Sequence, residues 1–156
     1  MKTMYSPVAV ALLFIAVSFE VDLPCPYRCT CEKDYYYTNI DCKNKGLTVC
    51  PSYFPTRSSY IYLQDNQITT VQQGAFQNLE VLFSIYLQDN EITLIEQGAF
   101  QNLSNLGKIY LQDNEITTIE QGAFQNLRGL YKIYLQNNLI TAVNGTLQGL
   151  TSLSYV

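Results

Sequence analysis

The sequence predicts an α/β solenoid, built from stacked copies of one short unit. The first observation is a 24-residue phrase that begins at Ile61 and returns at Ile85, Ile109 and Ile133. A fixed period of this length is typical of solenoids, in which each repeat packs on its neighbours. The second observation is a regular alternation of apolar and polar residues inside each phrase. The third is a cluster of cysteines that precedes the first copy.

The chain begins with an unbroken apolar run, Val8–Val17. Small residues around Ser18 then suit cleavage of a secretory signal after that position. The run is too short to span a bilayer, and a buried core helix is the alternative interpretation. We therefore expect residues 1–18 to be a signal peptide and the mature chain to be extracellular, whether secreted or part of a cell-surface ectodomain.

Five cysteines follow, at positions 25, 29, 31, 42 and 50. In a secreted chain such a cluster is typical of disulfides. Zinc is the alternative, but the spacing lacks paired C-x2-C units and the chain has no histidine. Spacing alone leaves the pairing open. We expect residues 19–57 to form a cap, because the first coil would otherwise expose a sheet edge and bare core.

Each repeat carries two apolar residues two positions apart, as at Ile85 and Leu87. Residues two apart on a strand point to the same side, so both should face the interior. An asparagine follows, as at Asn90. Its amide can pair with backbone groups that the inward bend leaves without partners. Ile92 and Phe100 should continue the interior on the way to the next repeat.

The pattern L-x-x-L-x-L-x-x-N, read from Leu82 to Asn90, resembles the extracellular leucine-rich repeat family in its 24-residue, phenylalanine-containing form. The cysteine-rich stretch resembles the N-terminal cap of that family, which implies the disulfides Cys25–Cys31 and Cys29–Cys42. The resemblance also implies a curved parallel sheet on the concave side, with short helical or irregular segments on the convex side. About four repeats, the last incomplete, are expected over residues 58–156.

Three features depart from the family pattern. The interval between the third and fourth cysteines contains the extra segment Asp34–Tyr37. Cys50 is an odd cysteine, either a buried thiol that packs as a small apolar group or a partner in an intermolecular disulfide. The unit Val143–Leu150 is one residue shorter than its counterparts, and no cysteine cap or anchor follows it. We expect a fragment, an incomplete gene model or a partner that covers this end.

Strand residues that alternate with the buried ones should face outward in columns, since parallel strands stack about 4.8 Å apart. One column is tyrosine in every repeat, and a glutamine column runs beside it. Ring stacking and amide hydrogen bonds would stabilise the sheet. An exposed aromatic row also offers contact area at low entropic cost. A neighbouring column differs in every copy, as a specificity-determining column would: Ser59, Phe83, Gly107 and Tyr131.

We therefore expect a ligand to contact the concave face. The residues expected to bind it are Tyr62, Phe83, Tyr86, Lys108, Tyr110, Tyr131, Lys132 and Tyr134.

An acidic column runs along the same face at Asp65, Asp89 and Asp113. We expect solvated carboxylates and no metal, although a bound cation or a basic partner is the alternative. Glutamates outside the strands, such as Glu96 and Glu120, are expected to be solvated too. The sequence also contains two glycosylation sequons, which begin at Asn102 and Asn144.

The composition excludes several function classes. Charged residues are 14% of the chain and the net charge is −4, which argues against nucleic-acid binding through a basic surface. Without histidine or a glycine-rich phosphate loop, the sequence predicts neither an enzyme nor a cofactor. The leading interpretation is an extracellular recognition module that binds a protein or a carbohydrate on its concave face.

The resemblance to variable-lymphocyte-receptor and Toll-like ectodomains implies a role in innate or receptor-type immunity. Two alternatives stay open: an extracellular matrix, adhesion or guidance-type structural protein, and a fragment of a larger receptor ectodomain. No transmembrane span is expected in this chain, and its oligomeric state is not indicated.

Overall fold

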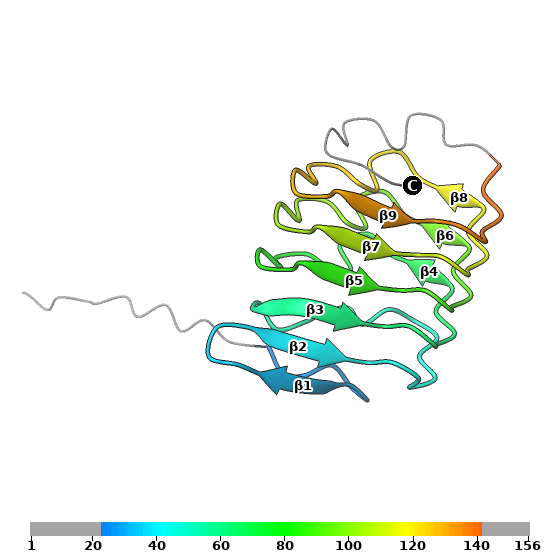
Figure 1. Ribbon diagram of the computed structural model, residues 1–156. Coiled ribbons are helices and arrows are strands. Elements are labelled where there is room, and N and C mark those ends of the chain that lie inside the picture. Colours follow the sequence, from blue (N-terminus) through cyan, green and yellow to red (C-terminus); the bar gives the residue numbers. More distant parts are fainter. Residues whose placement is uncertain (1–22, 142–156) are drawn as a thin grey trace, which may run out of the picture.

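The computed structural model describes residues 23–141, which form a stack of coils with a sheet along one side (Figure 1). The expected signal peptide, the sequon at Asn144 and the shorter last unit lie outside these residues. Within the described part, the main sheet has six strands in the order β1-β2-β3-β5-β7-β9.

The cap supplies the first two strands. β1 (Thr30–Lys33) and β2 (Thr38–Asp41) form an antiparallel hairpin, and β2 then pairs in parallel with β3 (Ser58–Tyr62). The hairpin therefore converts the open edge of the array into an antiparallel edge strand, as a cap must. Two disulfides hold it, Cys25–Cys31 and Cys29–Cys42, which confirms the pairing implied by the family resemblance.

The repeats supply the remaining strands of this sheet, all of them parallel. After β3 come β5 (Ser84–Tyr86), β7 (Lys108–Tyr110) and β9 (Lys132–Tyr134). Their registers align the isoleucines that open each phrase, so the 24-residue period is confirmed as one coil per repeat. The expected inward residues are buried, and Leu87 and Leu111 have no exposed surface.

A second sheet was not expected from the sequence. It consists of β4 (Thr70–Val71), β6 (Leu94–Ile95) and β8 (Thr118–Ile119), which pair in parallel beyond the carboxyl ends of the main strands (Figure 1). The rest of each coil is turns, and residues 23–141 contain no helix. Of the two forms expected for the convex segments, the described part shows the irregular one.

Stacked phenylalanines form the far side of the core. The ring centroids of Phe54, Phe76, Phe100 and Phe124 follow one another at 5.6, 5.4 and 5.4 Å. Each ring is buried; Phe54 comes from the cap, and each of the first three repeats contributes one ring to the same spine. Because no coil could bury its phenylalanine alone, this spine is a main reason why the repeats must stack.

The asparagine column satisfies backbone groups as expected. Asn90 Nδ2 donates to the carbonyls of Leu63, Leu87 and Gln88, while its Oδ1 accepts from the backbone N–H of Ile68 in the preceding repeat. The equivalent asparagines of the other described repeats bond in the same way: Asn66, Asn114 and Asn138. Asn66 accepts from the cap, so the first repeat also fixes the cap.

Glu96 and Glu120, which the sequence predicts to be solvated, also bond to the preceding repeat. Glu96 Oε2 accepts from the backbone N–H of Gln73 at 2.9 Å, and Glu120 Oε2 accepts from that of Gln97 at 2.8 Å. Each carboxylate therefore reaches back one repeat and pairs with a turn N–H. Charged acceptors make stronger hydrogen bonds than neutral ones, so these glutamates join adjacent coils on the convex side.

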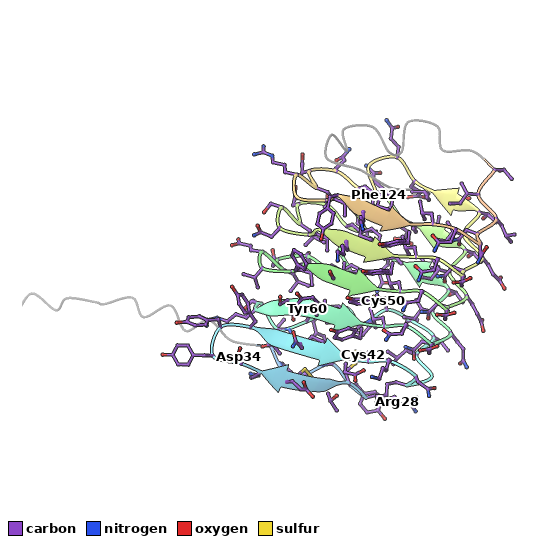
Figure 2. All side chains as sticks on the ribbon, in the orientation of Figure 1. Arg28, Asp34, Cys42, Cys50, Tyr60 and Phe124 are labelled. Atoms are coloured by element: carbon purple, nitrogen blue, oxygen red, sulfur yellow. A yellow bond between two sulfur atoms is a disulfide. The ribbon has the colours of Figure 1, made fainter. Side chains whose placement is uncertain are left out.

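Cys50 is the free cysteine, and it is buried. Burial raises the pKa of its thiol to about 12. Of the two interpretations of this residue, the structure therefore favours the packed, protonated thiol. The carbonyl of Cys50 accepts a hydrogen bond from Nε2 of Gln72 in the first repeat at 2.9 Å, and Figure 2 labels Cys50 among the stacked side chains.

Candidate ligand-binding face

Four tyrosines form a stacked row on the outward side of the main sheet. Successive ring centroids from Tyr62 through Tyr86 and Tyr110 to Tyr134 are 4.8, 4.5 and 4.7 Å apart, with the ring planes within 20° of parallel. All four side chains are half-buried. We call this surface the tyrosine face. Because neighbouring rings cover one another's faces, the row offers ring edges and hydroxyl groups to a ligand.

The row also raises the pKa of two of its own hydroxyl groups. Burial raises the pKa of Tyr62 and of Tyr86, and the adjacent tyrosines raise both further. The two phenols therefore stay neutral well above neutral pH. A neutral phenol both donates and accepts a hydrogen bond, so the row is suited to uncharged as well as charged ligand groups.

The glutamine column does not form the full set of expected amide hydrogen bonds. The Oε1 atoms of Gln64, Gln88 and Gln112 are buried and accept no hydrogen bond from the described residues. The observed contact that orders this face is therefore ring stacking, and the glutamines lie two residues beyond the tyrosines that end the strands.

The column that varies between repeats lies at the start of the strands. Phe83 is 38% exposed, and the Tyr131 ring lies beside Lys108, whose Nζ is 5.8 Å from the ring centroid. The nearby phenols of Tyr110 and Tyr131 raise the pKa of Lys108. Ser59 is largely covered. The column therefore presents two aromatic rings with a cation over the second.

Six of the eight predicted binding residues lie in strands of the main sheet, and the other two, Phe83 and Tyr131, directly precede β5 and β9. The Phe83 ring contacts Tyr60 and the Tyr131 ring lies beside Lys108. Three small residues that the strand alternation predicts to face outward are buried: Ser59, Ser84 and Gly107. Of these, Ser84 bears directly on the tyrosine face. It stands between Tyr60 and Lys108 in the same column, and the longer side chains of these neighbours cover it. The face is therefore interrupted at this position rather than continuous.

The acidic column lies at the other end of the strands. Asp65, Asp89 and Asp113 are exposed and adopt left-handed backbone conformations, with φ of 58°, 57° and 57°. Aspartate and asparagine tolerate this conformation better than most residues, which explains their presence there. Burial and the charges of Asp113 and Asp65 raise the pKa of Asp89. No metal-capable group of three or more acidic or cysteine side chains occurs in residues 23–141.

The extra segment of the cap forms a second group of aromatic residues. Asp34–Tyr37 closes the β1–β2 hairpin, where the N–H of Asp34 donates to the carbonyl of Tyr37 at 2.8 Å. Tyr35 and Tyr36 project from the turn and are 83% and 64% exposed, and Figure 2 shows Asp34 at this projecting end. The segment stood out in the sequence by its length, but nothing there indicated which surface it approaches.

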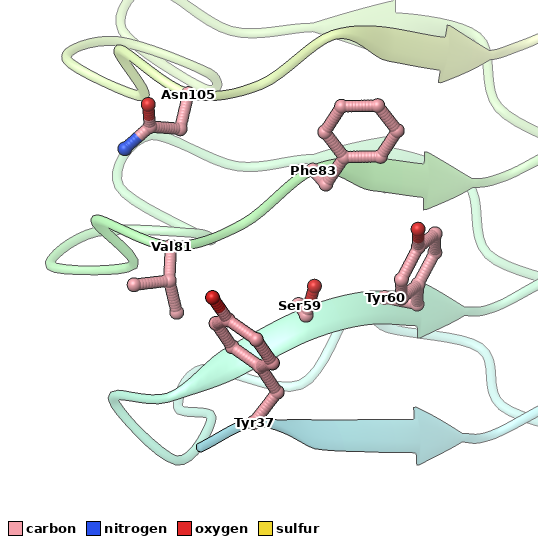
Figure 3. A pocket seen from close by; sticks show the side chains of 6 residues that line it. All are labelled: Tyr37, Ser59, Tyr60, Val81, Phe83 and Asn105. Atoms are coloured by element: carbon pink, nitrogen blue, oxygen red, sulfur yellow. The ribbon is translucent and has the colours of Figure 1, made fainter.

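The hairpin approaches the start of the repeat strands and encloses a hollow of about 600 Å³ (Figure 3). Tyr37 forms one wall, and the start of β3 and the loops before β5 and β7 form the others. The lining residues are Tyr37, Ser59, Tyr60, Val81, Phe83 and Asn105. Sequence reasoning placed Ser59, Tyr60 and Phe83 on the outward side of the strands but missed this hollow, because the other lining residues come from separate coils.

The sequence matches a family model that fits this geometry. The model described as "Leucine rich repeat" matches residues 59–116 and again 104–156. These ranges together cover more than half of the chain and begin at the first repeat strand. The chain belongs to the leucine-rich repeat family.

Curated leucine-rich repeat relatives match over part of the chain. Rat decorin is 34% identical over 73 residues, which are 44% of this chain and 20% of decorin. Human fibromodulin is 41% identical over 54 residues, or 35% of this chain and 14% of fibromodulin. Zebrafish leucine-rich repeat-containing G-protein coupled receptor 6 is 38% identical over 58 residues, or 37% of this chain and 6% of the receptor. The chain thus spans a small part of these relatives' length.

Solved leucine-rich repeat structures share the fold. Human 5T4 (trophoblast glycoprotein) superposes with a TM-score of 0.71 at 23% identity, over 85% of this chain and 52% of 5T4. A complex of Latrophilin 3, Unc5D and the leucine-rich repeats of FLRT2 contains a chain that superposes with a TM-score of 0.70 at 25% identity, over 85% of this chain and 40% of that chain. The described residues include no helix long and apolar enough to cross a membrane.

The sequon at Asn102 lies on a turn of the third described coil, away from the strands of the main sheet. Asn102 and Ser104 are exposed, whereas Leu103 between them is buried. Asn102 adopts a left-handed conformation with φ of 63°, and its Oδ1 accepts a hydrogen bond from Nδ2 of Asn126 in the next repeat. Asn102 and Ser104, which a glycosyltransferase must reach, are therefore accessible. The turn that carries them is held by the hydrogen bond from Asn126 in the next repeat.

Proposed function

We propose that this leucine-rich repeat chain is an extracellular recognition module that binds a protein or a carbohydrate ligand through the tyrosine face. The observation that carries the proposal is the stacked row of four half-buried tyrosines, flanked by a column that differs in every repeat. Aromatic side chains dominate the energetics of most protein interfaces. A regular scaffold beside a variable column would combine contact area with specificity.

Two observations support an extracellular location. The cap contains two disulfides, which form and persist in oxidising compartments. The exposed sequon at Asn102 would be modified in the same compartment. We further propose a receptor-type role, in innate or other immunity, with residues 1–18 as signal, residues 19–57 as cap and residues 58–156 as repeats.

The size of the face predicts weak binding by this chain alone. Five parallel strands at about 4.8 Å span roughly 24 Å, and seven extended residues span roughly 23 Å, which gives about 550 Å². A standard interface buries roughly 800 Å² on each partner. The repeat strands are only three to five residues long, so the effective face is no larger than this. Additional contact outside the face would increase the affinity.

The proposal is tested by screening the secreted chain against arrays of extracellular proteins and of glycans, and then by comparing variants with the ligand found. Tyr86→Ala and Tyr110→Ala should weaken binding at least tenfold, since each removes an aromatic contact at the centre of the face. Gln97→Ala, at an exposed position of a convex turn, is the matched control and should leave binding unchanged. Loss of binding in the control but not in the tyrosine variants would disprove the proposal.

An extracellular matrix, adhesion or guidance-type structural role is the second candidate. It is favoured by the ring stacking itself, which would stabilise the sheet without any ligand. In that case Tyr86→Ala and Tyr110→Ala would lower the free energy of unfolding, but would not change association with any partner found in the screen. The same two variants therefore discriminate between the candidates.

A further inference from the structure

The hollow beside the cap hairpin has the size and position of a binding site. Its volume of about 600 Å³ lies within the range of ligand pockets in proteins. It sits at the start of β3, β5 and β7, next to the tyrosine face, and it is open to solvent between Tyr37 and the loops before β5 and β7 (Figure 3).

The walls of the hollow are mostly apolar. The rings of Tyr60 and Phe83 meet edge to face with centroids 5.9 Å apart, and Val81 lies on the side of the hollow opposite these rings (Figure 3). None of the six lining residues carries a carboxylate, an ammonium or a guanidinium group. Removing apolar surface from water is favourable, so an uncharged apolar group is the occupant that these walls stabilise best.

The polar groups in the hollow are too few to favour a sugar. Asn105 already donates from Nδ2 to the carbonyl of Glu80 at 2.6 Å, which leaves the hydroxyls of Tyr37, Ser59 and Tyr60 and the Oδ1 atom of Asn105. A sugar ring carries a hydroxyl on most of its carbons, and each one that leaves water without a new partner costs free energy. An aromatic or branched aliphatic side chain has no such groups. The lining therefore favours an amino-acid side chain.

The charged residues beside the hollow indicate which group should lie next to that side chain in the partner. A second hollow, of about 290 Å³, shares Tyr37 with the first and is lined on its other side by Lys33, Asp34 and Arg57. These three groups sum to one positive charge. The Arg57 side chain is exposed and can pair with a carboxylate in a bidentate manner. A partner whose apolar anchor is adjacent to an acidic group would match both hollows at once.

We propose that the two hollows on either side of Tyr37 bind a segment of a partner protein in which a large apolar side chain adjoins a carboxylate. The apolar side chain fills the hollow between Tyr37, Tyr60 and Phe83, and the carboxylate lies by Arg57. This site lies next to the tyrosine face. It rests on the proposed function only through Phe83, which belongs to the variable column of that proposal.

The experiment is a titration of the secreted full chain, labelled with ¹⁵N, with blocked dipeptides observed by NMR. The main probe is acetyl-Phe-Asp-amide, with acetyl-Phe-Lys-amide and acetyl-Gly-Asp-amide as controls and methyl β-glucoside as the carbohydrate. We expect saturable shifts at the amides of Ser59, Tyr60 and Phe83, with Kd of about 1 mM. Phe-Asp should bind about threefold more tightly than Phe-Lys, as one exposed ion pair allows, and Gly-Asp should not bind.

Variants assign the two parts of the site. Phe83→Ala should weaken Phe-Asp binding about tenfold, and Arg57→Ala should abolish the preference for Phe-Asp over Phe-Lys. Tyr86→Ala should change neither, so a failure of the tyrosine face would not affect this result. If Phe83→Ala fails to fold, Val81→Lys tests the same wall by placing a charge in it. Saturation by the glucoside but not by Phe-Asp, or shifts that persist in both wall variants, would overturn the proposal.

Discussion

Gly107 lies directly beneath the ring of Tyr131. A Cβ atom at Gly107 would approach Cε1 of Tyr131 to 2.7 Å and Cε2 of Phe83 to 3.3 Å. The missing side chain in one repeat therefore makes room for the rings of the repeats on either side. The variable column is thus a packed unit, in which the small residue determines how closely the two large ones approach.

This contact predicts a difference between two glycine substitutions. Gly129→Ala would place Cβ 2.6 Å from the backbone carbonyl oxygen of Ser104, which cannot move without shifting a whole coil. We expect it to lower the free energy of unfolding by about 1–3 kcal/mol, as overpacking does. Gly107→Ala meets only the end of a side chain, so it should cost less and should instead displace the Tyr131 ring. Urea unfolding followed by tyrosine fluorescence measures the free energy of unfolding of both variants. Equal losses in the two variants would contradict the difference between a backbone contact at Gly129 and a side-chain contact at Gly107.

The asparagine column predicts a large loss at Asn90. Asn90→Ala leaves the buried N–H of Ile68 without a partner, whereas the carbonyls of Leu63, Leu87 and Gln88 keep bonds from Asn66, Asn114 and Asp65. One orphaned buried N–H costs about 1–3 kcal/mol, so the free energy of unfolding should fall by about that amount. Gln97→Ala is the exposed control. A loss below about 0.5 kcal/mol for Asn90→Ala would show that water replaces the amide.

The acidic column predicts a small gain from Asp89→Asn. Because the folded-state pKa of Asp89 lies above its unfolded value, the ionised carboxylate destabilises the fold at neutral pH, and this penalty disappears as pH falls below the pKa. Asparagine tolerates the backbone, since Asn137 has a φ of 57° at the equivalent position. We expect a gain of about 0.3 kcal/mol at pH 7, because the group is largely exposed. Thermal unfolding at about pH 3, or in high salt, should show no gain.

The same column predicts no response to calcium. The exposed carboxylates lie on separate repeats, and residues 23–141 contain no group of three or more ligands placed to hold a metal. The melting temperature should therefore be equal in calcium and in chelator. A clear rise in calcium that Asp89→Asn abolishes would make the column a metal site.

Cys50 should be unreactive in the folded chain. With a pKa of about 12, its thiol stays protonated at pH 8, and the thiolate is the nucleophile. Iodoacetamide should therefore add one group after unfolding in denaturant and none before it, with the four disulfide-bonded cysteines protected in both states. Cys50→Ser should take up no label. A dimer that appears on a non-reducing gel and is lost in Cys50→Ser would instead support the interpretation of Cys50 as a partner in an intermolecular disulfide.

The sequon at Asn102 should be occupied when the chain is secreted from animal cells. Both sequon residues that matter are exposed, so treatment with an N-glycosidase should lower the apparent mass. Asn102→Gln should remove the part of that shift that is due to this site. An unchanged mass in Asn102→Gln would show that the buried Leu103 keeps the site from being modified.

The repeat interior could be predicted from the sequence because it depends on a period. Leu87 and Leu111 occupy one position of a repeated phrase, and the regular fold gives each of them the same buried environment. The cap disulfides were likewise predictable, although only through resemblance to a family, since the cysteine spacing itself allows several pairings. Both features recur in every repeat or in every cap of this kind.

Features that depend on contacts between coils could not be predicted. The strands β4, β6 and β8 are two residues long and leave no alternation to read. In the sequence, Glu120 looks like any solvated surface residue. Only the structure shows that its carboxylate accepts a hydrogen bond from the preceding turn. The hollow requires the position of Tyr37, which comes from an irregular insertion that follows no period.

The asparagine hydrogen bonds link the folding of each coil to the synthesis of the next one. The N–H of Ile68 is bonded by an asparagine 22 residues further along, and that of Ile92 by another 22 residues further along. A ribosome releases the chain from its N-terminus, so the bend of each coil stays without its partner until the strand and the asparagine of the next coil have emerged. Folding of this array therefore trails synthesis by one repeat, and the emerging chain always carries one bend whose N–H must still bond to water.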